Sequence, residues 1–266
     1  MTRYDLPELG GVVYHGDAIE VMAQLPEASV DLVFADPPYN LQLRQRLKRP
    51  EGGYYEGVDE DWDRFESFEA YDAFTERWLS EARRVMKPEA TIWVMGTYHN
   101  IFRVGKIMQD LGFWILNDVI WHKLNPPPHF RGVRFQHATE TLIWAAYDSR
   151  ARYTFDYHRM KAINGGKQMQ NVWRLPICQG SERLRLPDGR RLHPTQKPEA
   201  LLERVVLASS RPGDCVLDPF FGTGTTGVVA ARHKRRFIGI ERELIYVEAA
   251  LRRLQQIHPE LPFDGV

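Results

Sequence analysis

The segment 214-DCVLDPFFGTGTTGVVAAR-232 joins a short apolar run, a glycine-rich loop and the start of an amphipathic stretch. Gly222, Gly224 and Gly227 satisfy the pattern G-x-G-x-x-G, and Glu241 ends the next apolar run. Backbone amides in such a loop can meet an anionic group at a helix N-terminus, while an acid after the following strand can bind ribose hydroxyls. The segment predicts a nucleotide-type ligand, the alternative being a glycine-rich turn that serves packing alone.

Working outward, six further apolar runs alternate with amphipathic segments. This alternation is typical of a mostly parallel sheet with helices on both faces. We therefore predict an α/β fold with a seven-stranded sheet. The expected strands are GVVYH (11–15), VDLVFA (30–35), ATIWVM (90–95), FWILNDVIWH (113–122), ETLIWAAY (140–147), DCVLD (214–218) and RFIGIE (236–241).

One helix is expected from a clear apolar stripe over residues 68–86. Ser67 stands where a capping residue is favoured. The stripe consists of Phe68, Tyr71, Trp78, Ala82 and Val85.

Composition limits the class of protein. The 266 residues suit one large domain, and 43% hydrophobic with 26% charged residues is typical of a soluble globular chain. No signal peptide and no long apolar run is seen, so a cytoplasmic location is expected. Neither Cys178 and Cys215 nor the nine histidines show a metal-ligand spacing, and no metal is predicted. With 35 basic and 35 acidic residues, a polyanion would have to bind local basic patches.

A nicotinamide-dependent dehydrogenase is the obvious rival reading of the glycine motif. However, only 25 residues follow Glu241, too few for the remaining strands of a dinucleotide-binding fold. The other half of the sheet must then come earlier in the chain, so that the motif order is circularly permuted. In that arrangement the strands at 11–15 and 30–35 lie beside those at 214–218 and 237–241.

A second motif, 36-DPPYN-40, follows the apolar strand at 30–35. Two adjacent prolines remove two backbone donors and restrict the chain, which makes a stiff elbow at the end of a strand. Alone, it could be an ordinary strand-ending turn. In the permuted arrangement, however, DPPYN and DPFFGTG open on one crevice at the carboxyl ends of the strands, where open α/β sheets bind ligands.

Five segments in this order carry a family resemblance: HGDAIEVM, VDLVFADPPYN, HPTQKPEALL, LDPFFGTGTT and FIGIE. They resemble the DNA amino-methyltransferases of the β arrangement, in which the catalytic motif precedes the cofactor loop. FADPPYNLQL, YHNIFRVG, LGFWILNDVIWHK and RFQHATETLIWA look most like the enzymes that methylate adenine N6 in GANTC, including the cell-cycle-regulated methyltransferases of bacteria. Those relatives typically carry a further C-terminal domain, whereas this sequence stops soon after LIYVEAALRRLQQI.

The resemblance implies site-specific DNA adenine-N6 methylation with S-adenosylmethionine. The amino group of adenine is a poor nucleophile, and two acceptors on its N–H bonds would localise its lone pair. The Asp36 carboxylate and the Pro37 carbonyl, held by Pro38, are the expected acceptors. The base must leave the duplex, and Tyr39 is expected to stack on it. Asn40 is expected only to support the turn.

The same resemblance implies the cofactor residues. Glu241 would bind the ribose, Asp17 the adenine amino group of the cofactor and Phe220 its ring face. Lys197 would lie near the carboxylate at the methionine end of the cofactor. Asp17 could instead cap a helix, and Lys197 could be a solvated charge beside a helix start. The full predicted set is Asp17, Ala18, Asp36, Lys197, Asp218, Phe220, Gly222, Thr223, Gly224, Thr225 and Glu241.

The DNA partner is expected to contact two irregular regions within a single catalytic domain at 1–266. Residues 41–63 predict a mobile loop over the site, and about 122–192 predict a target-recognition insertion. Arg235 and Arg236 begin a strand and are expected to be structural. The base-edge candidates are Arg44, Arg131, Arg134, Asn125 and Gln136, and the phosphate candidates are Arg183, Arg185, Arg190 and Arg191.

Three alternatives stay open at this point. Cytosine-N4 methylation uses the same kind of exocyclic amine, and Asp36 before PPY only leans toward adenine. A NAD-dependent oxidoreductase is disfavoured by the missing downstream half. A DNA-binding protein without catalysis is the third. The resemblance also makes a homodimer plausible, while a role beside a restriction enzyme is undecided.

Overall fold

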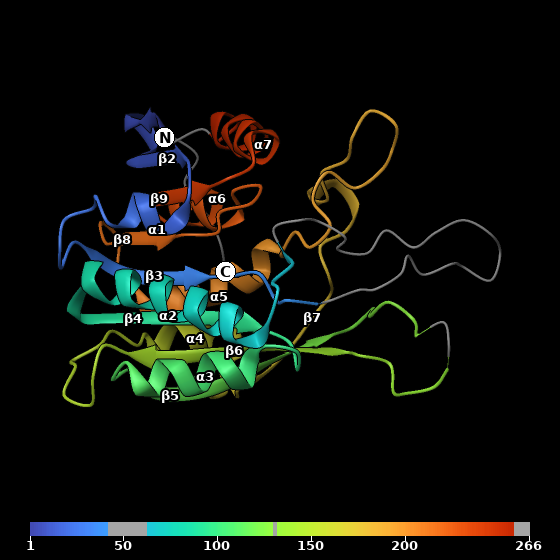
Figure 1. Ribbon diagram of the computed structural model, residues 1–266, viewed down its shortest axis with the longest axis horizontal. Coiled ribbons are helices and arrows are strands. Elements are labelled where there is room, and N and C mark those ends of the chain that lie inside the picture. The colour runs from blue at the N-terminus through green and yellow to red at the C-terminus, as the bar shows by residue number, and fades with distance from the viewer. Residues whose placement is uncertain (42–62, 130–131, 258–266) are drawn as a thin grey trace.

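The computed structural model describes residues 1–41, 63–129 and 132–257. Within these residues one nine-stranded sheet runs through the molecule in the order β1-β2-β9-β8-β3-β4-β6-β5-β7 (Figure 1). The strands are β1 (Thr2–Leu6), β2 (Gly11–His15), β3 (Val30–Ala35), β4 (Met86–Gly96), β5 (Trp114–Lys123), β6 (Thr139–Ala146), β7 (Val172–Leu175), β8 (Cys215–Asp218) and β9 (Arg236–Glu241).

All seven predicted strands are present, but the predicted number was too low. The two additional strands, β1 and β7, lie at the two edges of the sheet. β1 has the polar sequence TRYDL and no buried residue, and β7 is only four residues long. Each pairs with one neighbour and lacks the continuous apolar run of a strand covered on both faces, so the sequence pattern did not reveal them.

The centre of the sheet confirms the circularly permuted arrangement. β3 pairs in parallel with β8, in a register that sets Leu32 opposite Val216, and β2 pairs in parallel with β9. Strands far apart in the sequence therefore lie side by side, as predicted. The parallel region spans β2, β9, β8, β3 and β4, whereas β6 is antiparallel to both β4 and β5. The sheet is thus mixed toward the β7 edge.

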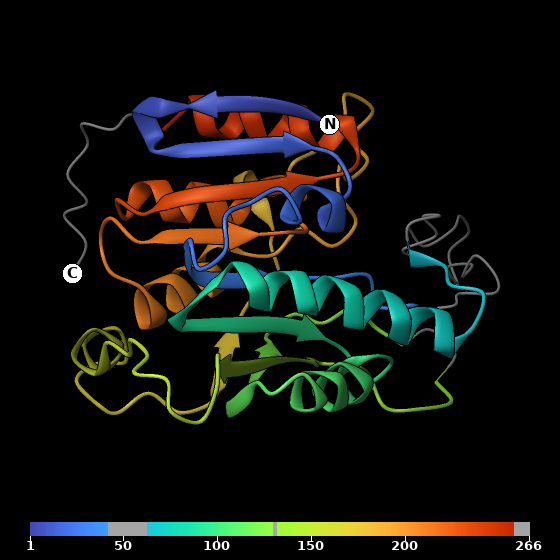
Figure 2. The ribbon, with the colours of Figure 1, turned by 60° about the vertical axis from the view of Figure 1, so that its left-hand side comes forward.

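Helices cover both faces of the sheet (Figures 1 and 2). α1 (Ala18–Met22), α2 (Phe68–Val85) and α3 (Ile101–Asp110) contribute to one apolar cluster, around Trp78, Val104 and Ile92. On the opposite face, α5 (Glu199–Ser209), α6 (Thr225–Arg232) and α7 (Leu244–Gln255) contribute to a second, around Val205 and Phe237. α4 (Tyr157–Ile163) packs against α5 through Met160. Two 3₁₀ turns, Pro7–Leu9 and Gly180–Glu182, complete these elements.

α2 begins as the sequence predicted. The Ser67 hydroxyl accepts a hydrogen bond from the Ala70 amide at 3.1 Å, and Tyr71, Trp78, Ala82 and Val85 are buried. The expectation that Phe68 belongs to the buried stripe is wrong, since its side chain is 47% exposed. Phe68 lies in the first turn and is covered only in part, by the Arg103 guanidinium 4.6 Å from its ring centroid.

In the described part of the chain, none of the helices combines the length and apolar character needed to cross a bilayer.

Candidate active site

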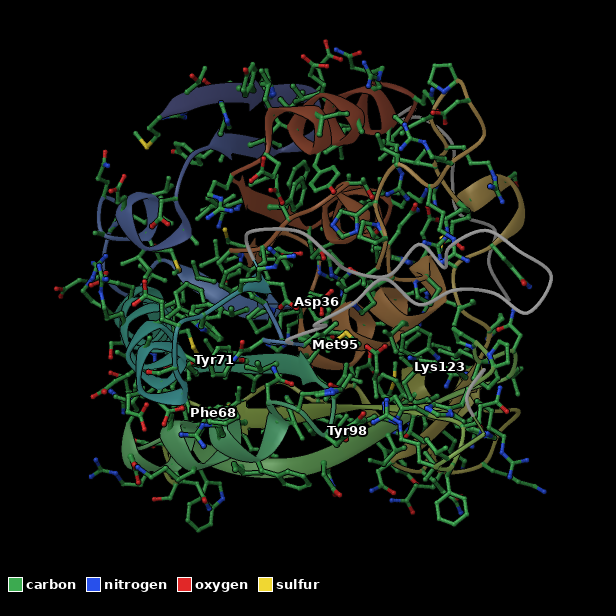
Figure 3. All side chains as sticks on the ribbon, turned by 45° about the vertical axis from the view of Figure 1, so that its right-hand side comes forward. Asp36, Phe68, Tyr71, Met95, Tyr98 and Lys123 are labelled. Carbon is green, nitrogen blue, oxygen red and sulfur yellow. The ribbon has the colours of Figure 1, made fainter. Side chains whose placement is uncertain are left out.

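The two motifs line one cavity of about 330 Å³ at the carboxyl ends of β3, β8 and β9. Parallel pairing of β3 with β8 places Asp36 and Asp218, which end or follow these strands, at the same edge of the sheet. Figure 3 views this edge, with Asp36 beyond β3 and Lys123 at the end of β5. The predicted residues that line the cavity are Asp17, Ala18, Asp36, Pro37, Pro38, Tyr39, Lys197, Asp218, Phe220, Gly222, Thr223, Thr225 and Glu241.

The elbow is held by a carboxylate that the sequence analysis missed. Asp63 is 3% exposed and accepts the backbone amides of Tyr39, Asn40 and Leu41 at 2.6, 2.8 and 2.9 Å. Burial raises the pKa of Asp63 while these three amides oppose the rise. Asn40 has φ of 54°, a left-handed conformation that turns the chain so that consecutive amides converge on one acceptor. No sequence signal separated Asp63 from the other acids of its irregular segment.

A second anchor comes from α2. The Tyr71 hydroxyl donates to the Pro38 carbonyl at 2.9 Å and accepts from the Asn100 side-chain amide at 3.0 Å. Burial raises the pKa of Tyr71 to about 12, so the hydroxyl keeps its proton at neutral pH. In the described residues the Pro37 carbonyl has no protein donor, which leaves the predicted second acceptor open.

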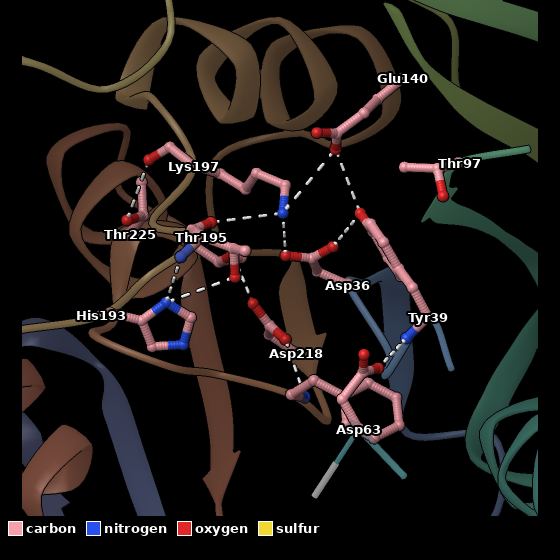
Figure 4. Close-up of polar contacts among 12 residues, drawn as sticks. Asp36, Tyr39, Asp63, Thr97, Glu140, His193, Thr195, Lys197, Asp218 and Thr225 are labelled. Atoms are coloured by element: carbon pink, nitrogen blue, oxygen red, sulfur yellow. Dashed lines mark hydrogen bonds and ion pairs between the residues drawn. The ribbon is translucent and has the colours of Figure 1, made fainter. Parts of the chain in front are cut away.

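Asp36 has a partner on each of its carboxylate oxygens (Figure 4). Oδ1 accepts from the Tyr39 hydroxyl at 2.6 Å, and Oδ2 contacts the Lys197 ammonium. Burial raises the pKa of Asp36, and the charge of Lys197 opposes that rise. Lys197 was predicted to lie near the carboxylate of the cofactor. It does line the cavity, but its Nζ donates to the Asp36 carboxylate.

Glu140 joins this group from β6, and the sequence analysis did not identify it. Its Oε2 lies 3.1 Å from the Tyr39 hydroxyl and 3.9 Å from Lys197 Nζ, while its Oε1 pairs with Lys123 at 2.6 Å. Burial alone would raise the pKa of Glu140, but the charges of Lys197 and Lys123 outweigh it and lower that pKa. Carboxylates likewise raise the pKa of Lys197 against its burial. The cluster holds two carboxylates and two ammonium groups.

The glycine loop, which contains Gly222 and Gly224, is held by the acids Asp218 and Glu241 on either side of it. The two oxygens of Asp218 accept from the Phe220 amide at 3.0 Å and from the Thr226 hydroxyl at 2.6 Å. Glu241 accepts the Gly222 amide at 2.7 Å through Oε2. Burial raises the pKa of Asp218 to about 7, and burial also raises that of Glu241.

Gly224 is the one predicted cofactor residue that does not line the cavity. Its φ is +80°, and a Cβ built there would lie 2.8 Å from the Cβ of Ala250 in α7. Gly227 has a related packing role, because a Cβ would lie 2.5 Å from the Phe221 ring. The last two glycines of the motif therefore permit close packing, and only Gly222 faces the cavity.

The position of Asp17 is compatible with both of its predicted roles, as a helix cap and as a cofactor contact. Its Oδ1 caps α1 by accepting the amides of Ile19 and Glu20 at 2.9 and 3.1 Å, and the residue lines the cavity. The Phe220 ring also lines the cavity and is fixed edge-on against Trp78, with ring centroids 5.3 Å apart.

His193 is a further lining residue that the sequence analysis did not single out. Burial, with the charges of Lys197 and Arg183, lowers its pKa to about 3, so its ring is neutral. Its Nδ1 accepts the Thr195 amide at 3.2 Å, and its ring lies 4.5 Å from that of Tyr246.

The predicted DNA contacts are spread more widely. Arg134 is exposed and donates to the Tyr98 hydroxyl at 2.8 Å, next to Phe135, which is 98% exposed. Asn125 pairs with Gln179, and Gln136 with proline carbonyls. Arg185 and Arg190 are exposed on the loop at 183–192, and Arg191 is half-buried there. Arg44 and Arg131 lie outside the described residues.

Arg183 requires a correction. It is 8% exposed and donates through Nε and Nη2 to the Cys178 carbonyl at 2.9 and 2.7 Å. A guanidinium used this way holds the turn before α5 and is not presented to a phosphate. Arg235 was expected to be structural and is buried against the Ser210 carbonyl.

Comparisons with known proteins agree with this geometry. Residues 30–252 match the family described as DNA methylase. The chain is 48% identical over 259 residues to the type II methyltransferase M.HinfI of Haemophilus influenzae, covering 97% of this chain and 72% of that one. It is 44% identical to the type II methyltransferase M2.DpnII of Streptococcus pneumoniae, covering 92% and 89%.

Two solved structures show the same fold. The M1.HpyAVI–SAM complex matches with a TM-score of 0.67 at 26% identity, covering 91% of this chain and 98% of that one. The cytosine-N4-specific PvuII DNA methyltransferase matches with a TM-score of 0.72 at 22% identity, covering 94% and 89%.

Proposed function

The chain belongs to the DNA methylase family, and from this premise we propose that it transfers a methyl group to N6 of an adenine extruded from duplex DNA. It is an S-adenosylmethionine-dependent DNA methyltransferase, as its relatives and its fold establish. The single observation that carries the choice of reacting residues is the shared cavity of Asp36, Gly222 and Glu241.

The cavity suits the cofactor in size and charge. At about 330 Å³ it falls within the range of small-ligand sites. The carboxyl groups of Asp17 and Glu241 line it, which favours a ligand with a positive charge. When bound, S-adenosylmethionine supplies an electrophilic methyl group on a sulfonium. We propose that Glu241 binds the ribose and Asp17 the adenine of the cofactor.

The elbow then aims the nucleophile. Asp36 and the open Pro37 carbonyl would each accept one N–H of the amino group, which concentrates the nitrogen lone pair toward the methyl donor. Asp63 and Tyr71 hold the elbow in place. A fixed acceptor costs no reorganisation when the reaction occurs.

Extrusion of the base costs a few kcal/mol, and an aromatic ring can return about 1–3 kcal/mol by stacking. We propose that Tyr39 provides this ring, since it lines the cavity beside Asp36. Its hydroxyl is tied to Asp36 and Glu140, which restrains the ring.

For DNA recognition we propose the insertion at about 122–192 within a single catalytic domain. Arg134 and Phe135 are exposed there, and so are Arg185 and Arg190 in the last part of the insertion. The resemblance to the GANTC enzymes and the 48% identity to a type II methyltransferase support GANTC as the target and a modification role. We further propose a homodimer on the same resemblance.

The experiment supplies radiolabelled S-adenosylmethionine and duplexes that contain either GANTC or a scrambled site. We expect label in the GANTC duplex alone, and N6-methyladenine after digestion and mass spectrometry. N4-methylcytosine as the sole product would replace the adenine proposal, and label in both duplexes would remove the GANTC assignment. A cofactor thermal shift completes the test, because stabilisation by NAD alone would contradict methyl transfer.

A further inference from the structure

The reacting carboxylate is already engaged before any base arrives. Lys197 and the Tyr39 hydroxyl occupy the two oxygens of Asp36. A carboxylate neutralised by an ammonium is a weaker acceptor for an incoming amine. In addition, the amine nitrogen gains positive charge as the methyl group is transferred, so an ammonium fixed on Asp36 would oppose the reaction. Both donors must therefore have another place to go.

Glu140 offers that place to both donors. Its Oε2 lies 3.1 Å from the Tyr39 hydroxyl and 3.9 Å from Lys197 Nζ. The tyrosine has one hydroxyl proton and needs only a rotation to redirect it. Lys197 needs to move its Nζ by about 1 Å to reach the usual length of a charged hydrogen bond.

Glu140 is itself held for this exchange. Lys123 pairs with the opposite oxygen, Oε1, at 2.6 Å, and both side chains are about nine-tenths buried. Oε2 is thereby kept pointing toward Tyr39 and Lys197, as Figure 4 shows. Movement of Lys197 from Asp36 to Glu140 keeps its buried charge paired throughout, which avoids the large cost of an isolated ion.

We propose that Glu140 is a positioning residue that takes over Lys197 and the Tyr39 hydroxyl when the target base enters, which frees Asp36 to accept the amino group. This inference rests on the proposed function of Asp36. Glu140 acts through its two donors and does not contact the base.

The test compares Glu140→Gln with wild type. Glutamine keeps the size and one acceptor oxygen but has no charge to hold Lys197, so the ammonium stays on Asp36. We expect kcat to fall about 10- to 100-fold, with the dissociation constant for S-adenosylmethionine changed less than about twofold. Base extrusion, read as the fluorescence of 2-aminopurine at the target position, should persist. Glu140→Asp should restore part of kcat because it restores the charge.

Asp72→Asn is the control for the loss of one ion-pair charge away from the cavity, because Asp72 pairs with Arg103 on the surface between α2 and α3; its kcat should equal that of wild type. Unchanged kcat in Glu140→Gln would overturn the inference. So would a fall in kcat accompanied by loss of the 2-aminopurine signal, because that loss indicates a structural role. The product formed by the wild-type protein separates the two proposals. If wild type methylates cytosine, the adenine proposal fails, and the role of Glu140 is then tested with cytosine as the target base.

Discussion

The glycine loop and the elbow lie at one cavity but are held in different ways. The glycine loop is anchored by its own flanking acids: Asp218 binds Phe220 and Thr226, two and eight residues away, and Glu241 binds Gly222, 19 residues away. The elbow depends on Asp63, more than 20 residues away, and on Lys197, 161 residues away.

The difference teaches that the two motifs have different dependence on the rest of the fold. The glycine loop lies within one continuous strand–loop–helix–strand segment, β8 to β9, and the two acids at its ends accept amides of the loop. The elbow acquires its geometry only when α2, β6 and the segment before α5 have packed around it. Variants in the elbow should therefore change catalysis, whereas variants in the loop should change cofactor binding and stability.

The largest effect is expected from Asp36→Asn. The amide cannot accept an N–H with a full charge, and removal of one such electrostatic partner typically costs about 10²- to 10³-fold in kcat. Binding of S-adenosylmethionine, measured by calorimetry, should remain. Asp31→Asn in β3, the strand that leads into the elbow, is the control, because Asp31 pairs with Lys87 away from the cavity. Equal losses in both variants would show that the elbow has no special role.

Gly224→Ala should break the glycine loop. Both the φ of +80° and the contact with Ala250 oppose a side chain. We expect a cost of about 1–3 kcal/mol in the free energy of unfolding, seen as a lower Tm, and weaker cofactor binding. Gly213→Ala separates the two causes, since its φ is +89° but nothing lies within 4 Å of its added Cβ. A Tm loss no larger than in Gly213→Ala would remove the packing argument.

Asp63→Asn should loosen the elbow while the glycine loop stays intact. One carboxylate that accepts three amides becomes an amide with a single acceptor oxygen. If about 1.4 kcal/mol of positioning is lost, kcat falls about tenfold, and cofactor affinity is unchanged. Single-turnover methyl transfer and calorimetry measure these quantities. A selective loss of cofactor affinity would contradict the division between the two motifs.

Asp218→Asn is the same chemical change in the glycine loop, and its effect should appear in the pH dependence of stability and not in kcat. The pKa of Asp218 is about 7 in the folded state, well above the usual value of an aspartate, about 3.9. Between these values the folded state keeps the proton and the unfolded state loses it, so this group's contribution to stability falls as pH rises from about 4 to 7. Asparagine does not ionise, so the stability of the variant does not fall in this way as pH rises.

The Tm of Asp218→Asn relative to wild type should therefore rise between pH 5 and pH 8. Each kcal/mol corresponds to about 2–4 °C in a domain approaching this size. Thermal unfolding in matched buffers measures it. A Tm difference that is flat across this range would mean that Asp218 is ionised at low pH in the folded state.

Prediction from sequence succeeded where the chemistry is local in the chain. The seven apolar strands, the Ser67 cap, and the use of S-adenosylmethionine by a DNA methyltransferase are confirmed. The two edge strands and the exposed Phe68 were missed because partial burial leaves little pattern. Arg183 was assigned to phosphate contact because sequence alone does not distinguish a buried arginine from an exposed one in a run of basic residues.

By itself the sequence determined the alternation of strands and helices, the order of the two motifs and their meeting at one edge of the sheet, because hydrophobic period, proline stiffness and glycine spacing act over a few residues. Only the tertiary structure decided that Asp63 and Tyr71 hold the elbow, and that Asp36, Lys197, Glu140 and Lys123 share one buried charge cluster. Such partners depend on where separate strands and helices end in space, and no local pattern records that.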